Sequence, residues 1–418
     1  MVEIRTPIAV SEAIARVQAE AQRLPSEYVS LEESYGRILA KPLVATHDVP
    51  AFDRSPYDGF AIRAVDSLGA SGEHRIAFEV VDHIGAGQVS QKTLSAYQAI
   101  RIMTGAQLPQ GADAVVMLEQ TQADPKQPDR KFTLRKSFAV GENISFQGED
   151  MKLGEEIVPS GSLIHPGVIA LLATFGYEQV EVAKLPTVGI LSTGTELLET
   201  GAALEPGKIR NSNSPMIAAQ LRRIGIPYRM YSAAADQLDD MLKSIREALT
   251  ECEVLITTGG VSVGDFDLLP AVYEQLGAKV LFNKVAMRPG SVTTVATLGR
   301  QYLFGLSGNP SACYTGFELF VRPALLRMMG ATGIYPMHTQ AVLSEDFAKA
   351  NPFDRFIRAV YDGHEVRPAG FNKSNAVSSI GRSNALIVLP GGSRGFKIGD
   401  TVDVLLPGMD EGSPVWKL

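Results

Sequence analysis

The spacing of apolar and polar residues divides the chain into segments with different periods. Apolar residues recur every three or four positions over residues 10–24, which predicts a helix that Pro25 ends. Residues 50–140 instead hold short β-type runs between Gly, Pro and Asp turns, and the charged stretch 122–131 is typical of an exposed hairpin-like loop. A mainly β module is expected there, followed by a helix over residues 166–176.

Apolar runs and amphipathic runs alternate between residues 186 and 330. Four of the apolar runs, TVGIL, YRMYSA, EVLITT and YLFGL, read as strands, and a long final helix is expected over SACYTGFELFVRPALLRMMG. Strand–helix alternation of this kind predicts a parallel, doubly wound sheet. After Pro336 the helical period vanishes, and short strands joined by Gly and Pro turns predict a small barrel-like domain.

Composition narrows the class of protein. The 418 residues are 45% hydrophobic and 20% charged, as in soluble globular proteins with more than one domain. The net charge of -7 and the lack of a dense Lys/Arg cluster argue against a nucleic-acid partner. Cys252 and Cys313 are far apart, which favours a reducing cytoplasm over a disulfide framework. Neither a signal-peptide core nor an uncharged run of roughly 18 apolar residues is present, so we expect no membrane partner.

Small or polar loops follow each of the four strands of the alternating region. They read STGTEL, AADQ, GGVSVGDFD and SGNPSA, and the carboxyl ends of parallel strands share one edge, where open α/β sheets bind ligands. Each loop also has an ordinary structural explanation. Glycine pairs make turns, Asn309 before Pro310 can cap a helix, and Asp265 or Asp267 can cap the helix that follows.

The convergence of these loops favours a site. Glycines admit a ligand close to the backbone, and helix starts offer N–H groups to an anion. Carboxylates beside a phosphate usually imply a divalent cation, since they would otherwise repel the anion. The carboxylates available at this edge are Glu196, Asp236, Asp265 and Asp267.

Two cations four residues apart lie in NKVAMRPGS. Lys284 and Arg288 are explained equally well as solvated charges and as a clamp for an oxyanion, with Arg as a planar fork and Lys as a point charge. Other motifs fail. GAALEPGKIR lacks the Ser or Thr of a P-loop, no GxGxxG follows a strand, no GxSxG occurs, and the six histidines lack metal-ligand spacing.

Taken together, the loop motifs resemble those of one family. TTGGVSVGDFD, STGTEL, KVAMRPG and SGNPSA resemble motifs of the molybdopterin molybdenumtransferase family, which includes MoeA and the C-terminal domain of gephyrin. SPYDGFAI, RIMTGAQLPQGADAVVMLE, GENISFQGED and SSIGRSNALIVLP resemble further family motifs in the same order. The resemblance covers nearly the whole chain and several independent motifs, so it is specific.

The resemblance implies a four-domain, elongated, multidomain α/β fold that forms a homodimer. Its parts are an elongated helical/β linking domain, a mainly β domain inserted into it, an α/β molybdopterin-binding domain with the doubly wound sheet, and a C-terminal β-barrel domain. The corresponding ranges are 1–49 plus 141–180, 50–140, 181–332 and 333–418.

The resemblance also implies a reaction. The family inserts molybdate into adenylylated molybdopterin with Mg²⁺ or a similar divalent cation, and releases AMP and molybdenum cofactor. A molybdopterin adenylyltransferase is an expected partner. Two alternatives stay open: the chain could itself be an adenylyltransferase, although those enzymes resemble only the central domain, or a non-catalytic scaffold like gephyrin.

Family positions carry over residue by residue. The resemblance implies catalytic roles for four side chains, of which the first two also bind the metal: Asp265, Glu196, Asp58 and Thr104. It implies substrate-binding roles for Gly259, Gly260, Ser262, Asp236, Ser307 and Asn309. Positions around the molybdate are Lys284, Arg288, Arg358 and Ser379.

Two positions depart from the family pattern. Ser291 stands where the family often has Lys, which removes one positive charge from the implied oxyanion site. Ser145 stands where Arg usually precedes GED, so we assign it no role in the site.

Overall fold

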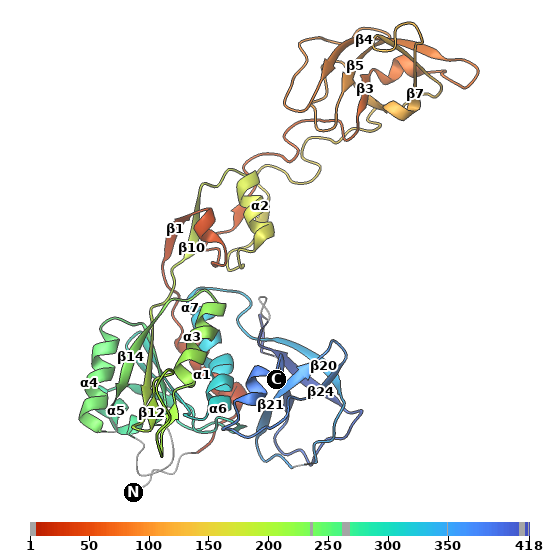
Figure 1. The fold of residues 1–418 in the computed structure, drawn as a ribbon. Helices are drawn as coiled ribbons and strands as arrows, with labels where there is room; N and C mark the ends of the chain where they lie inside the picture. Colours follow the sequence, from red (N-terminus) through yellow and green to blue (C-terminus); the bar gives the residue numbers. More distant parts are fainter. Residues whose placement is uncertain (1–5, 235–236, 261–267, 349, 409–413, 417) are drawn as a thin grey trace. The chain divides into compact units, whose positions relative to one another are not determined.

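The chain divides into two compact units. A computed structural model describes residues 6–234, 237–260, 268–348, 350–408, 414–416 and 418. The large unit comprises Met1–Lys41, Pro159–Leu171 and Tyr177–Leu418, and the small unit comprises Pro42–Val158 and Leu172–Gly176 (Figure 1). No helix of the described residues is long and apolar enough to cross a membrane.

The small unit is built on one sheet with apolar side chains on both faces. Its strands run in the order β6-β3-β5-β4-β8-β7, all antiparallel neighbours except β4 and β5. Stacked rings of Phe60, Phe78 and Phe132 fill one face, and Ile100 lies in the cluster on the other. The mainly β module predicted from the sequence is therefore confirmed. The strands are β3 (Gly59–Ile62), β4 (Ile76–Ile84), β5 (Gln98–Ile102), β6 (Ala114–Met117), β7 (Thr121–Ala123) and β8 (Lys131–Leu134).

The predicted hairpin-like loop and several short elements complete this region. Residues 125–130 are exposed between the antiparallel strands β7 and β8. The remaining short elements are β2 (Leu43–Val44), β9 (Glu156–Val158), η2 (Ala64–Ser67) and η3 (Leu118–Gln120). In the large unit, β1 pairs antiparallel with β10. The elements around this pair are β1 (Ser26–Ser30), η1 (Glu32–Ser34) and β10 (Gln179–Ala183), and α2 (Pro166–Thr174) is the helix expected before β10.

A six-stranded sheet forms the centre of the large unit, in the order β14-β11-β15-β19-β18-β16. The first four strands are mutually parallel, as predicted. Strand β18 runs antiparallel to both β16 and β19. Only Gly299 and Arg300 separate it from β19, and so short a link can form only a hairpin with that strand. The strands are β11 (Val188–Thr193), β14 (Tyr228–Ala234), β15 (Val254–Thr258), β16 (Lys279–Phe282), β18 (Thr294–Leu298) and β19 (Gln301–Leu306).

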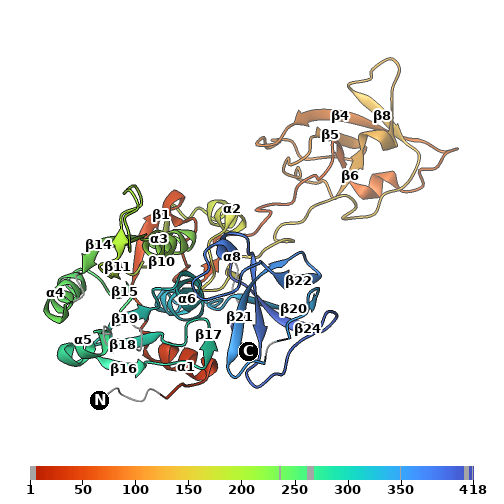
Figure 2. The same cartoon turned by 60° about the horizontal axis from the view of Figure 1, so that its bottom comes forward.

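Helices cover both faces of this sheet, which confirms the doubly wound fold (Figure 2). Successive strand residues point to opposite faces. Ile256 accordingly packs in the cluster with α1, α3, α6 and α7, whereas Leu255 packs in the cluster with α4 and α5. The helices are α1 (Val10–Glu20), α3 (Asn213–Arg223), α4 (Leu238–Leu249), α5 (Leu269–Leu276), α6 (Pro310–Gly316) and α7 (Arg322–Met328).

Two helices differ from their predicted form. The first helix ends at Glu20, four residues before the last apolar position of the pattern. The long helix over residues 311–330 is interrupted by η4 (Phe317–Val321), a π-helical segment that joins α6 to α7. Pro323 lies two residues after the end of this segment, and a proline lacks the N–H and crowds the carbonyl of the preceding turn, which favours a wider turn there.

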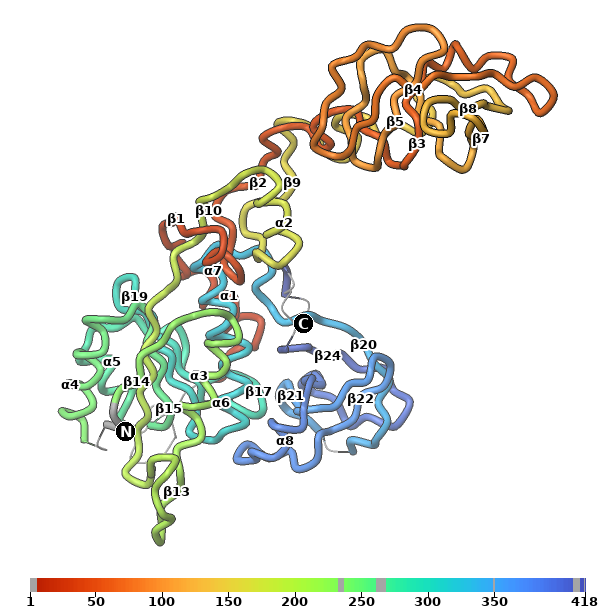
Figure 3. Tube along the Cα trace, turned by 45° about the horizontal axis from the view of Figure 1, so that its top comes forward, coloured from red at the N-terminus to blue at the C-terminus, as the bar shows by residue number. Residues whose placement is uncertain are grey.

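The C-terminal strands close into a barrel. The closed ring is β21-β22-β20-β24-β23, with β23 paired back to β21, and β17 adds parallel to the start of β21 (Figure 3). Phe356 and Leu386 pack in the same cluster as one face of the central sheet, so barrel and sheet share a core. The elements are β17 (Met287–Arg288), β20 (Met337–Leu343), β21 (Asp354–Tyr361), β22 (Glu365–Pro368), α8 (Ser378–Gly381), β23 (Ala385–Leu389) and β24 (Thr401–Leu406).

Candidate active site

The carboxyl ends of β11, β15 and β19 lie side by side. Ser192 is in register with Thr258, and Thr258 with Leu306. The Gly259 N–H donates to the Leu306 carbonyl at 3.1 Å, and the Thr193 hydroxyl donates to the Thr258 carbonyl at 3.4 Å. The loops that begin after these strands therefore start at one edge. The loop after β14 begins there too, but Asp236 lies outside the described residues.

Gly259 is required by the packing of neighbouring strand ends. Its φ is +94°, and a Cβ added there would lie 2.6 Å from the Thr193 carbonyl oxygen. Gly260 also has a positive φ, and a Cβ there would lie 3.2 Å from the Thr193 hydroxyl. Contact with Thr193 and the left-handed backbone therefore account for glycine at both positions without any ligand.

Asn213 joins three of these segments, although sequence reasoning missed it. It begins α3, is 6% exposed, and its Nδ2 donates to the Gly308 carbonyl at 2.8 Å and to the Thr258 hydroxyl at 3.1 Å. A carbonyl oxygen can only accept, so the NH₂ group must face Gly308. Asn at a helix start looks like an ordinary cap in sequence, so only the long-range partners reveal this role.

The loop Ser307–Asn309 enters α6 as the sequence predicts. Asn309 occupies the N-cap position and Pro310 the first turn. The Ser307 side chain is buried, and its hydroxyl accepts from the Asn309 N–H at 3.2 Å. Asn309 is exposed, and within the described part of the chain its side chain makes no capping hydrogen bond. The Ser311 N–H at this helix start donates to the Ser374 carbonyl at 3.1 Å.

Arg358 is a buried cation held by neutral groups. Only 1% of its surface is exposed, its Nε donates to the Ser379 hydroxyl at 3.2 Å, and its Nη2 donates to the Lys373 carbonyl at 3.1 Å. Burial, with a smaller effect from Arg355, lowers the pKa of Arg358 to about 10. An anion bound beside Arg358 would offset this cost of burying charge.

A third arginine, Arg355, was also missed from the sequence. It lies opposite Arg288 in the β17–β21 register, and burial and then Arg288 lower its pKa. Its guanidinium lies 4.7 Å from the Phe347 ring centroid, and that of Arg288 lies 5.9 Å from Phe353. Along a strand, residues three apart point to opposite faces, so the spacing of Arg355 and Arg358 did not suggest a common site.

The structure also describes the other two predicted cations and the two serines that differ from the family pattern. Lys284 is half-buried between β16 and β17, and Arg288 is exposed on β17. The Ser291 carbonyl accepts from the Val285 N–H at 2.9 Å, and Ser145 exchanges two backbone hydrogen bonds with Arg54 at 2.9 Å. Both departures therefore have local structural contacts, and the Ser291 position carries no charge.

Only part of the predicted acidic set can be located. Glu196 is exposed in the loop after β11, and its carboxylate folds over Gly194. Asp265, Asp267 and Ser262 lie outside the described residues, as does Asp236. The described residues contain no group of three or more metal-ligating side chains. Helix α5 begins with Leu268 at its N-cap position rather than either aspartate.

The small unit brings Asp58 and Thr104 together. One carboxylate oxygen of Asp58 accepts from the Thr104 N–H at 2.7 Å and from its hydroxyl at 2.9 Å. These bonds, with a lesser contribution from Arg101, hold the pKa of Asp58 below its ordinary value. The pair therefore presents an ionised carboxylate on the surface of this unit.

Glycine-containing loops at the carboxyl edge of a doubly wound sheet, with a buried arginine on the attached barrel, place this chain among the open α/β proteins whose ligand sites lie at that edge. Family sequence models match three stretches: "MoeA N-terminal region (domain I and II)" over residues 8–176, "Probable molybdopterin binding domain" over 189–327, and "MoeA C-terminal region (domain IV)" over 340–406. The chain belongs to the MoeA family, as the sequence motifs indicated.

Full-length relatives agree with this assignment. A curated molybdopterin molybdenumtransferase of Staphylococcus epidermidis is 58% identical over 409 residues, 97% of each chain, and one of Staphylococcus aureus is 55% identical over 414 residues, 98% of each. The crystal structure of a molybdopterin biosynthesis MoeA protein from Pyrococcus horikoshii OT3 matches with a TM-score of 0.84 and 30% identity. That match covers 96% of this chain and 100% of the other.

Proposed function

We propose that this chain inserts molybdate into adenylylated molybdopterin and releases AMP and molybdenum cofactor. Its full-length similarity to curated molybdopterin molybdenumtransferases supports a transferase of molybdenum cofactor biosynthesis. The observation that carries the proposal is Arg358, a buried cation bonded to a hydroxyl and a carbonyl, in the same compact unit as the loops at the sheet edge.

Molybdate is a tetrahedral dianion with four acceptor oxygens. Guanidinium groups present several N–H donors to such oxygens, and a buried site strengthens the charge-assisted bonds. In this proposal Arg358 and the Ser379 hydroxyl bind molybdate, with Lys284 and Arg288 as further cations. Arg355 adds positive charge near Arg288 and compensates in part for the lysine that Ser291 replaces.

The loops at the sheet edge bind the pterin and its phosphates in this proposal. Gly259 and Gly260 let the phosphates approach the backbone, and the polar side chains assigned to the same substrate are Asp236, Ser262, Ser307 and Asn309. The proposal includes a Mg²⁺ ion or similar cation, because Mg²⁺ is usually held by one or two carboxylates together with substrate phosphates. Asp265 and Glu196 would hold it, and the cation would neutralise charge on the phosphate linkage and polarise it.

The small unit contributes Asp58 and Thr104, whose shared hydrogen bonds keep the carboxylate ionised. We propose that they act at the cleft of the second protomer in a homodimer. A molybdopterin adenylyltransferase would supply the adenylylated substrate. Mixing an Asp58→Asn protein with an Asp265→Asn protein tests the shared site, since mixed dimers then regain activity in one cleft.

The reaction itself is tested by incubating the protein with adenylylated molybdopterin, molybdate and Mg²⁺ and measuring AMP release. The expected result is molybdate-dependent release that Asp265→Asn reduces. Consumption of ATP to form the adenylate would instead support an adenylyltransferase. No AMP release by the folded parent protein would favour a non-catalytic scaffold and contradict the proposal.

A further inference from the structure

The start of α6 is bonded to a turn of the barrel through a single buried residue, Ser311. This residue is fully buried, its hydroxyl donates to the Ala376 carbonyl at 2.6 Å, and its N–H donates to the Ser374 carbonyl at 3.1 Å. Ser311 follows the loop Ser307–Asn309 by two residues. The turn of the barrel is thus fixed directly to the loop at the sheet edge.

The same turn also holds Arg358. The Lys373 carbonyl accepts from the Arg358 Nη2 at 3.1 Å and from the Ala376 N–H at 3.1 Å, which closes the turn. Two residues after Ala376 the chain enters α8, where the Ser379 hydroxyl accepts from the Arg358 Nε. Both hydrogen bonds that orient the buried guanidinium therefore come from one short segment, Lys373–Ser379.

We propose that Ser311 is a positioning residue that sets the orientation of Arg358 through the segment Lys373–Ser379. This proposal rests on the proposed function, in which Arg358 binds molybdate and Ser307–Asn309 binds the pterin substrate. Two substrates that react must be held at a fixed separation, and small displacements reduce the rate steeply. Ser311 provides the link, because it stands between the loop that binds one substrate and the turn that orients the arginine for the other.

Helix α6 provides a matched control. The Thr315 hydroxyl is also fully buried, but it donates to the Ser311 carbonyl at 2.9 Å, within the same helix. Thr315→Val removes a buried hydroxyl from α6 without touching the barrel turn. Ser311→Ala removes the hydroxyl that crosses to the barrel. Ser311→Cys keeps nearly the volume of serine with a weaker donor, and it replaces the alanine variant if that variant does not fold.

The experiment measures AMP release by the full chain as a function of molybdate concentration. Loss of one hydrogen bond changes binding by about fivefold, so Ser311→Ala is expected to raise the KM for molybdate about fivefold, with a smaller change in kcat. The KM of Ser311→Cys for molybdate should lie between those of Ser311→Ala and the parent. Thr315→Val should leave this KM unchanged. In a double-mutant cycle with Arg358→Lys, Ser311→Ala should change the KM for molybdate little. The guanidinium that Ser311 orients is already absent in that background.

Two outcomes would overturn the inference while the proposed function stands: an unchanged KM for molybdate in both Ser311 variants, or an equal effect of Ser311→Ala in the Arg358→Lys background. Failure of the parent protein to release AMP in a molybdate-dependent way would contradict the proposed function instead. Binding of molybdate to the parent and to Ser311→Ala, measured by calorimetry without the pterin, gives a readout independent of turnover, and equal affinities would also refute the link.

Discussion

Asn213 and Gly308 are joined by a hydrogen bond of 2.8 Å that connects the start of α3 to the loop after β19. The same amide group donates to Thr258, so one side chain fixes the ends of two strands relative to a helix. We expect Asn213→Asp to lower the free energy of unfolding by about 1–3 kcal/mol or more at neutral pH, since it places a carboxylate against a carbonyl. Urea unfolding measures this, and Asn213→Ala should be less damaging. An aspartate variant as stable as the parent would contradict the assignment.

Gly259→Ala should be more harmful than an alanine at another left-handed glycine. Its added Cβ would meet the Thr193 carbonyl at 2.6 Å, whereas Gly277, with φ of +67°, has open space around a Cβ. Gly277→Ala should therefore lower the free energy of unfolding only by the strain of an alanine in the left-handed conformation, roughly 1–2 kcal/mol. Thermal unfolding of the two variants compares them directly. Equal losses would show that contact with Thr193 is unimportant.

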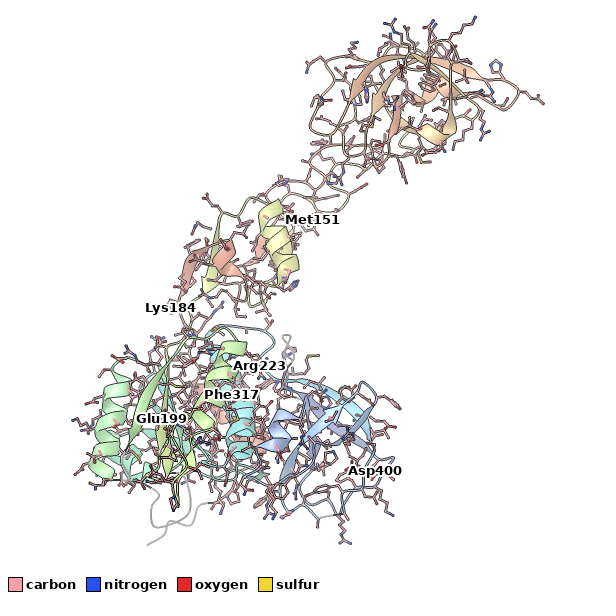
Figure 4. The ribbon with its side chains drawn as sticks, in the orientation of Figure 1. Met151, Lys184, Glu199, Arg223, Phe317 and Asp400 are labelled. Carbon is pink, nitrogen blue, oxygen red and sulfur yellow. The ribbon has the colours of Figure 1, made fainter. Side chains whose placement is uncertain are left out.

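Removal of the buried Glu318 side chain is expected to destabilise the large unit, although burial raises the pKa of its carboxyl and so disfavours the charge itself. Glu318 is fully buried on η4, pairs with Arg223 of α3 at 2.5 Å, and accepts from Gln220 at 2.6 Å; Figure 4 labels Arg223 and the neighbouring Phe317. Removing one partner of a buried pair leaves the other uncompensated, so Glu318→Ala should cost about 3–5 kcal/mol. The exposed pair Arg229–Glu251 is the control, where Glu251→Ala should cost at most about 1 kcal/mol.

Arg358→Met should stabilise the free protein and abolish its stabilisation by molybdate. The pKa of Arg358 is lowered to about 10 by burial and by Arg355, so the folded state disfavours the charged form, and this penalty is present in full below that pH. Molybdate at a hundredfold excess over its Kd should stabilise the parent by about 2.7 kcal/mol. Differential scanning calorimetry with and without molybdate separates the two effects. A molybdate-dependent rise in the Tm of Arg358→Met would refute the assigned role.

Thr104→Val should raise the pKa of Asp58 only part of the way to its ordinary value. The backbone N–H of Thr104 has the largest effect on that pKa and remains in the variant, whereas the hydroxyl is lost. Because the folded pKa is depressed, the ionised carboxylate stabilises the fold above the unfolded pKa, and this contribution disappears as the pH falls through the folded pKa. Titration of the Asp58 carboxyl by NMR tests the shift. An unchanged pKa would mean that the hydroxyl does not contribute.

The doubly wound sheet could be predicted because each of its signals lies within a short stretch of the sequence. Each strand is an apolar run, and each is followed at once by a small or polar loop, so the common edge of β14, β11, β15 and β19 follows from strand direction alone. The antiparallel pairing of β18 with β19 follows from the link of two residues between them. The alternation of strands and helices does not indicate this pairing. The apolar spacing continues through Pro323, so it predicts one regular helix and gives no sign of the π segment before that proline.

The site was predictable where motifs lie within one loop and not where distant segments meet. Asn213, Ser311 and Arg355 gain their roles from partners 45 to 95 positions away or on another strand, and nothing near them in sequence signals this. The Asp58–Thr104 pair was predicted only through the family resemblance, since its members are 46 positions apart in the sequence.

Strand β17 has a practical consequence for dividing this protein into pieces. It belongs to the central part of the chain, yet it pairs with Asp354 and Arg355 at the start of β21. A gene fragment that begins at residue 333 would encode the closed five-strand ring but leave that stretch of β21 without its neighbour and Phe356 without its shared core. The barrel is therefore not an interchangeable module: a chimera that exchanges it between relatives needs a matching segment 284–291 as well.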